Sequence, residues 1–246
     1  MYNKSNMKQE HKDIKVSGKE KAGIEGWHTL STCDIRDPKA KKVEANILSF
    51  LEDSRAKAKE IQKRILQVKS QILDTGVLDH LVDEKNHLRR KLQRHNLKQH
   101  QVLQQLYRQL QDLTLVNQVT VKNIIPTAGR TVIAEWIVGD NTNDADNGAN
   151  YGSLGDSNTA VANGDTTLGN ETYRKATSSA NNASNIAYLS NFYSATEVTG
   201  TFEEAGWHID GTGTTDSGEL LSHFLTGTIT KTSVETLTVE SQLTIS

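Results

Sequence analysis

The longest pattern in the sequence is a stripe of apolar residues that begins after Asp37-Pro38 and ends near Leu115. Its steps of three and four repeat a seven-residue period, which is the spacing of a coiled coil. Asp37 is placed as an N-cap and Pro38 as the first helical residue, and good helix formers dominate the segment after them. The stripe predicts a helical stalk over residues 38–116, whose oligomer seam consists of Ile61, Ile65, Val68, Ile72, Leu81, Leu88, Leu92, Leu103, Leu106, Leu110 and Leu113.

This helical segment has one stop signal, at Asp74-Thr75-Gly76. A C-cap there would fold the segment into an antiparallel hairpin, whereas a tolerated glycine would leave a single rod of about 115 Å at 1.5 Å per residue. Of the two, we favour the rod. The seam has β-branched residues in its early part and leucines later, a pattern that fits a trimer about as well as a dimer.

After Val116 the apolar period changes from the helical value to two. Residues 235–246 alternate, with Leu237, Val239 and Leu243 on one face, as in a half-buried strand. Gly- and Asn-containing turn signals separate further apolar runs. The fold class predicted is therefore α+β by segment, with a long N-terminal helix or coiled coil followed by an antiparallel β-sandwich of jelly-roll type over 117–246. It has strands at 186–193, 202–209 and 220–230 and a short helix at 130–138.

Residues 1–37 are polar and rich in lysine, with too few apolar positions to fold alone. We interpret them as an extended segment that anchors the chain to other proteins. Trp27 is its candidate anchor, as a peg that inserts into a partner; the alternative is local packing on the adjoining helix.

Composition and charge narrow the class of protein. Hydrophobic residues make up 35% and aromatic residues 5% of the 246 positions, which favours burial of apolar surface between chains. The single cysteine, Cys33, excludes a disulfide framework, and no signal peptide or membrane span is evident, so we expect folding in a reducing cytoplasm. Residues 1–112 hold 23 Lys and Arg against 15 Asp and Glu. These charges are interleaved and lack stacking aromatics, which disfavours a nucleic-acid partner.

Five runs occur together and in order in the second half of the chain: IIPTAGRTVIAEWIVG (124–139), YGSLGDS (151–157), TTLGNETYRK (166–175), NIAYLSNFYSATEVTGTFEEAGWHIDGTGTTDSGELLS (185–222) and ITKTSVETLTVESQLTIS (229–246). With these runs, about residues 123–246 resemble a domain of tailed-bacteriophage virion structural proteins of the tail-fibre type. The resemblance implies a small β domain in a virus particle, without a known enzymatic activity. A stalk before a β head is also similar to the general plan of phage fibres.

Candidate chemistry is sparse. In TFEEAGWHID, residues 201–210, strand alternation puts Glu203 and His208 on opposite faces, and it separates Glu204 from His208 by about 13 Å. A core role for Trp207 fits this pattern better than catalysis, with Glu204 paired to backbone or to Arg174. His80, Glu84 and His87 form only half a metal site on one helix face, and DNTNDADNG (140–148) lacks the calcium-loop spacing. We therefore expect no catalytic residue, cofactor or metal.

These observations favour a virion structural protein: a homotrimeric fibre or appendage that is held to capsid, neck or tail proteins by its N-terminal segment. Its β domain would contact host glycans through Tyr151, Tyr188 or Tyr193, and no membrane is involved. One alternative is a capsid decoration or neck protein that clamps neighbouring subunits, which a helix folded back at Asp74-Gly76 would favour. The other is a glycan depolymerase, which would need paired carboxylates in a groove.

Overall fold

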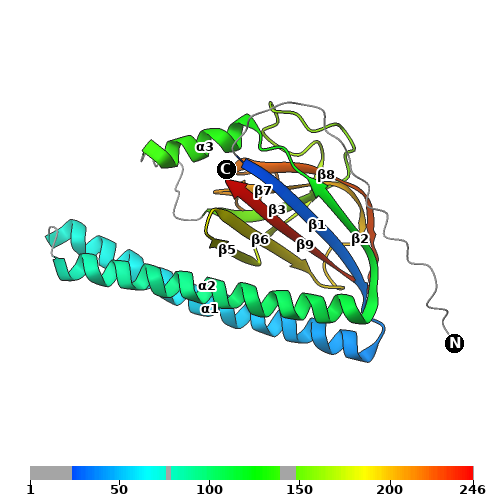
Figure 1. Ribbon diagram of the computed structural model, residues 1–246, viewed down its shortest axis with the longest axis horizontal. Helices are drawn as coiled ribbons and strands as arrows, with labels where there is room; N and C mark the ends of the chain where they lie inside the picture. Colours follow the sequence, from blue (N-terminus) through cyan, green and yellow to red (C-terminus); the bar gives the residue numbers. More distant parts are fainter. Residues whose placement is uncertain (1–23, 76–78, 139–147, 246) are drawn as a thin grey trace.

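The computed structural model describes residues 24–75, 79–138 and 148–245, which form three helices and two antiparallel β-sheets (Figure 1). The expected combination of a long helical part with an antiparallel β region is thus confirmed. Along the chain the elements are β1 (Ile24–Asp34), α1 (Pro38–Thr75), α2 (Asp79–Thr114), β2 (Leu115–Lys122), α3 (Thr127–Val138), β3 (Ala149–Gly155), β4 (Glu171–Ala176), β5 (Ser179–Ala183), β6 (Ile186–Tyr193), β7 (Gly200–Ile209), β8 (Glu219–Lys231) and β9 (Glu235–Ile245).

The two sheets have the strand orders β2-β1-β9-β6-β5 and β4-β3-β7-β8. A shared apolar core lies between them, built around Trp207, Phe224, Phe202 and Leu237, each with at most 2% of its surface exposed. We call these two sheets the two-sheet body. The strands predicted at 186–193, 202–209, 220–230 and 235–246 are all present, and so is the short helix, as α3.

Residues 24–34, which the sequence pattern placed in a separate anchor segment, form β1 inside the five-stranded sheet. This strand pairs with β9 along its whole length, from Ile24 opposite Ile245 to Asp34 opposite Glu235. Leu30 faces the core between the sheets, and Cys33 faces the helices. The segment is too polar to fold alone but is completed by a strand from the other end of the chain. Residues 1–23 lie outside the described residues.

The two long helices are an insertion between β1 and β2, which are neighbours in the sheet. The predicted N-cap is confirmed, because Asp37 Oδ1 accepts a hydrogen bond from the Lys39 amide at 2.7 Å. Both helices pack on the outer face of the five-stranded sheet, where a second core includes Ile47, Tyr107 and Phe192. The helical part is therefore not a stalk that precedes a β head, because sheet strands flank it on both sides.

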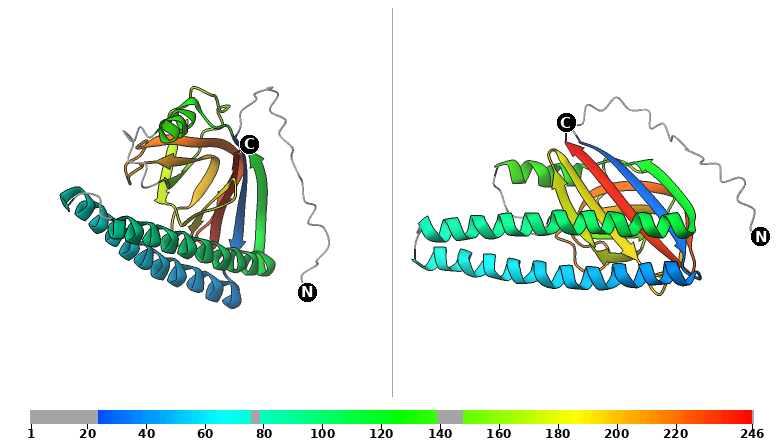
Figure 2. Two further views of the ribbon diagram at one scale, coloured as in Figure 1. Left: turned by 60° about the vertical axis from the view of Figure 1, so that its left-hand side comes forward. Right: turned by 60° about the horizontal axis from the view of Figure 1, so that its bottom comes forward.

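The expected single rod is wrong, because α1 and α2 lie side by side as an antiparallel hairpin (Figures 1 and 2). Arg64 of α1 donates to Glu84 of α2, and His95 of α2 lies 3.0 Å from the Ser54 carbonyl oxygen of α1. The apolar stripe thus finds its partner in the same chain. A seven-residue period specifies that a helix needs a partner but not which chain supplies it.

Helix α3 lies on the four-stranded sheet at β8, where Val132 enters the core between the sheets. Gly129 permits this close approach, since a Cβ at that position would stand 2.6 Å from the Leu221 carbonyl oxygen. The helix thereby covers part of the β8 strand, on the opposite side of the molecule from the hairpin (Figure 1).

Candidate functional site

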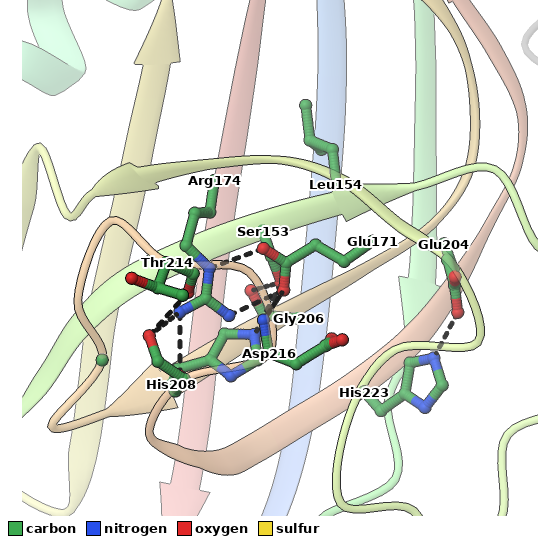
Figure 3. A network of polar contacts seen from close by, with 12 residues as sticks. Ser153, Leu154, Glu171, Arg174, Glu204, Gly206, His208, Thr214, Asp216 and His223 are labelled. Atoms are coloured by element: carbon green, nitrogen blue, oxygen red, sulfur yellow. Dashed lines mark hydrogen bonds and ion pairs between the residues drawn. The ribbon is translucent and has the colours of Figure 1, made fainter.

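A network of buried polar side chains lies in the four-stranded sheet, and it contains the residues that resemble a catalytic site (Figure 3). Its first part is the ion pair of Glu171 and Arg174 on β4, whose side chains are 1% and 3% exposed. The guanidinium donates Nε and Nη2 to the two carboxylate oxygens at 2.5 and 2.6 Å. Its Nη1 donates to the Ser217 carbonyl at 2.8 Å and to that of Thr212 at 3.1 Å. The pair thereby fastens β4 to the loop between β7 and β8.

The second part is centred on Glu204 of β7. Its carboxylate accepts hydrogen bonds from the backbone amides of Gly169 and Asn170, at 2.9 and 2.7 Å, so the expected pairing with backbone is confirmed. The side-chain partner is His223 of β8 at 2.8 Å, whereas the expected Arg174 pairs with Glu171. Burial raises the pKa of Glu204, but the hydrogen bonds from His223, Asn170 and Gly169 outweigh burial, and the pKa lies below its ordinary value.

His223 stands between two carboxylates, because its other ring nitrogen lies 2.8 Å from Asp165. Each ring nitrogen is thus within hydrogen-bond distance of one carboxylate oxygen. The sequence pattern gave no sign of His223, which stands among apolar residues of a strand. It lines a shallow surface pocket of about 280 Å³ together with Asp165 and several backbone segments. The arrangement joins β7, β8 and the loop before β4, and it presents no free base.

The third part is His208, whose Nε2 lies 2.7 Å from the Ser153 hydroxyl. A nucleophilic triad would place a carboxylate on the opposite ring nitrogen. Here the nearest carboxylate oxygen, on Glu171, is 3.9 Å from the same Nε2, and Nδ1 has no hydrogen-bond partner among the described residues. Ser153 and His208 are 2% and 0% exposed. Because neither reaches a surface, this cluster holds strands together rather than offering a site for a substrate.

The histidines of α2 considered as metal ligands are not arranged as a metal site. His80 and His87 are exposed on α2, and Glu84 is engaged by Arg64. Within residues 24–75, 79–138 and 148–245, no three His, Cys, Asp or Glu side chains gather as a metal site would require. The acidic stretch 140–148 falls outside the described residues except for Gly148. Over the same described part of the chain, no helix has the length and apolar character needed to cross a bilayer.

The aromatic residues proposed for contact with partners differ in how far they are exposed. Tyr193 is 1% exposed and packs in the core, so the expectation that it contacts a host glycan is wrong. Tyr151 is half-buried near the Arg174 guanidinium. Trp27 is 44% exposed on β1 and Tyr188 lies on β6, and both pair with Gln242 of β9 in one cross-strand row. Trp27 is thus a sheet residue that carries the Lys122 ammonium 4.6 Å from its ring centre.

The hairpin has a bound half and a projecting half. Glu44 and Arg55 of α1, and Gln99 and Gln104 of α2, hydrogen-bond to the two-sheet body. Beyond Arg55 and before Gln99 the helices extend past the sheet (Figures 1 and 2). We call the described residues of 56–98 the arm. At 1.5 Å per residue each of its helices is about 30 Å long. Residues 56–98 include eleven Lys and Arg against five Asp and Glu.

All the predicted seam residues lie on α1 or α2, and most of them are at least half-buried within this hairpin. Six of them are buried inside one chain: Ile61, Ile65, Val68, Leu81, Leu103 and Leu110. Ile72, Leu88, Leu92 and Leu106 are half-buried, and Leu113 is 43% exposed. Much of the apolar surface that supported the expectation of a trimer is therefore already used within the chain.

Replacing both Leu88 and Leu92 by Asp tests this assignment. Each change puts a charge into the contact between α1 and α2, at a cost of about 1–3 kcal/mol. We expect far-ultraviolet circular dichroism to show lost helix while tryptophan fluorescence stays unchanged, because Trp27, Trp136 and Trp207 all lie outside α1 and α2. Gln93→Asp, on the exposed side of the same helix, is the control. Dissociation of an oligomer with helix content intact would instead place the seam between chains.

Comparisons of the chain with protein-family models, with curated proteins and with solved structures gave no match.

Proposed function

We propose that the chain is a structural protein of a virus particle, of the decoration or neck type, which attaches to a neighbouring particle protein through the arm. The arm is the observation that carries this proposal. It is a basic hairpin whose base is fixed to the outer face of a sheet, and its flanking strands β1 and β2 belong to that sheet. A rigidly held projection of this kind can transmit load from a partner to the body.

Three further observations support a structural role. The helices fold back on each other, which gives a compact attachment rather than the long stalk of a fibre. The side chains best suited to acid/base catalysis are buried and hydrogen-bonded within the two-sheet body, namely those of Glu171, Glu204 and His208. Finally, the resemblance of residues 123–246 to virion structural proteins indicates the kind of assembly. A homotrimer and contact with host glycans remain predictions that the arm does not require.

Arm deletion tests the proposal. Ser54 lies opposite His95 and Arg64 opposite Glu84, so Ala58 and Lys91 face each other and a short Gly-Ser turn can replace the residues between them. Particles of the virus that encodes the chain are purified and their protein content is quantified. We expect the full chain in the particles and the deletion variant reduced by about tenfold or more, which corresponds to at least about 1.4 kcal/mol of lost binding.

The control is the fold of the deletion variant, monitored by near-ultraviolet circular dichroism of the two-sheet body. Absence of the full chain from purified particles would contradict the virion assignment. Full incorporation of the folded deletion variant would instead contradict attachment through the arm.

A further inference from the structure

The arm contains a groove of about 570 Å³ between α1 and α2. Its apolar lining comes from Ile61, which is 9% exposed, and from the half-buried Leu88. Exposed lysines border it on both helices: Lys57 and Lys63 of α1 and Lys91 of α2. The groove thus combines an apolar base with a cationic border.

The three lysines of this border have no acidic partner within the described part of the chain. Arg64, which also lines the groove, donates to Glu84 at 2.7 and 3.0 Å and is already neutralised. Glu60 is the one acidic residue among the lining side chains. Positive charge therefore remains in excess at the groove, and a ligand with carboxylates would complement it.

We propose that this groove binds an acidic amphipathic helix of a neighbouring protein. The inference rests on the proposed function, because it names the chemistry by which the arm attaches. Two antiparallel helices form a natural seat for a third, whose side chains fill the space between their ridges. From Lys57 to Gln67 the groove runs along about 15 Å of α1, which is the length of about three turns of a bound helix.

The groove lining favours a protein helix over the other anionic or helical occupants. A second copy of the arm would bring its own excess of positive charge, and like charges across an interface are unfavourable. Single-stranded nucleic acid gains affinity from aromatic stacking, and no aromatic side chain other than His95 lines the groove. Ile61 and Leu88 offer apolar contact that a phosphate backbone cannot use.

The test uses the full chain and a synthetic amphipathic helix with leucines on one face and glutamates beside them. The variant Lys57→Glu/Lys63→Glu/Lys91→Glu reverses the groove border. Its matched control, Lys59→Glu/Arg89→Glu/Lys98→Glu, makes the same charge change at exposed arm positions outside the groove. Fluorescence anisotropy gives the Kd for each protein. We expect the groove variant to bind at least about tenfold more weakly and the control to change by less than about threefold.

Further probes separate the remaining outcomes. A peptide with its leucines replaced by serine should bind weakly, whereas tight binding would show attraction by charge alone and would contradict a helix groove. Equal weakening in the control variant would contradict the assignment of the groove. Tighter binding of double-stranded DNA than of the peptide would make the arm a nucleic-acid interface instead. Matched circular dichroism of both variants confirms that the arm is folded, and Lys→Gln changes at the same positions replace any variant that is not.

Failure here is distinguishable from failure of the proposed function. If arm deletion removes the chain from particles but the groove variant is incorporated normally, attachment uses another surface of the arm and this inference is wrong while the function stands.

Discussion

Lowering the pH from 6 to 5 should reduce the free energy of unfolding by about 2.4 kcal/mol, through two buried histidines. His28 of β1 and His208 of β7 both have 0% of their surface exposed. Burial lowers the pKa of His28 to about 3, although a hydrogen bond from the ring to the Asn123 side chain opposes the shift. Burial, with the charges of Arg174 and His223, lowers the pKa of His208 to about 3. Both rings are therefore neutral in the folded protein at pH 5.

The environment of His28 shows why a proton is costly there. Its ring stacks on Phe224, with centres 3.7 Å apart, between the two sheets. Its Nδ1 lies 2.5 Å from the Ser241 hydroxyl, which also accepts a hydrogen bond from the Trp207 indole. No carboxylate among the described residues contacts the ring. A charged imidazolium would lose its hydration without gaining a counter-ion.

The sign of the effect comes from proton binding. Between pH 3 and 6.5 the unfolded chain binds a proton on each histidine that the folded chain does not, so stability rises with pH and is lost on acidification. Each histidine contributes at most about 1.4 kcal/mol per pH unit, and about 1.2 kcal/mol between pH 6 and 5, because the unfolded ring is not fully protonated at pH 6. Urea unfolding at several pH values between 5 and 6 measures the slope.

Substitution of the histidines provides the control for this slope. His208→Gln should reduce the slope of stability against pH by the equivalent of about one bound proton, because glutamine does not titrate. His28→Gln should reduce it by the equivalent of a second. His87→Gln, at an exposed position of α2, should leave the slope unchanged. A slope that remains at two protons after both core substitutions would show that other groups govern the acid response.

The repeat periods in the sequence predicted the elements well but not how distant elements pair. Strand alternation in residues 235–246 located β9, and the stripe after Pro38 located the helices, because both periods reflect which face of an element is buried. One of the two partners of β9 is β1, more than two hundred residues away, and no local pattern records that pairing. The stop signal at Asp74-Thr75-Gly76 offered the hairpin as the alternative to a rod, but the apolar stripe could not decide between them, since it is satisfied equally by another chain or by its own continuation.

The polar network was predictable only in part. Alternation placed Trp207 in the core correctly, but β7 has irregular pairing between Phe202 and Glu204 and again between Trp207 and His208. Glu204 and His208 lie on the other side of the strand from Trp207. Both are nevertheless buried, because the amides of Gly169 and Asn170 cover Glu204 and Ser153 contacts His208. His223 could not be paired with Glu204 from the sequence, because adjacent strands bring them together at a register that only the fold defines.

Loss of the buried ion pair should strongly destabilise the two-sheet body. Arg174→Ala leaves the Glu171 carboxylate, whose side chain is 1% exposed, without its cation. It also frees the Ser217 and Thr212 carbonyls that hold the loop between β7 and β8. Removing one partner of a buried pair costs about 3–5 kcal/mol, because an uncompensated charge remains inside.

The chain offers a matched comparison for this change. Arg36 also pairs with a carboxylate, that of Asp34, through a similar fork, but its side chain is 74% exposed. Arg36→Ala should cost less than about 1 kcal/mol, since water solvates the carboxylate that remains. Urea unfolding of both variants at pH 7 measures the difference.

Adding Glu171→Gln to the Arg174→Ala variant should recover part of the lost stability, because the unpaired buried charge is then gone. If the double variant is no more stable than Arg174→Ala alone, the cost lies in the lost loop contacts rather than in the unpaired carboxylate.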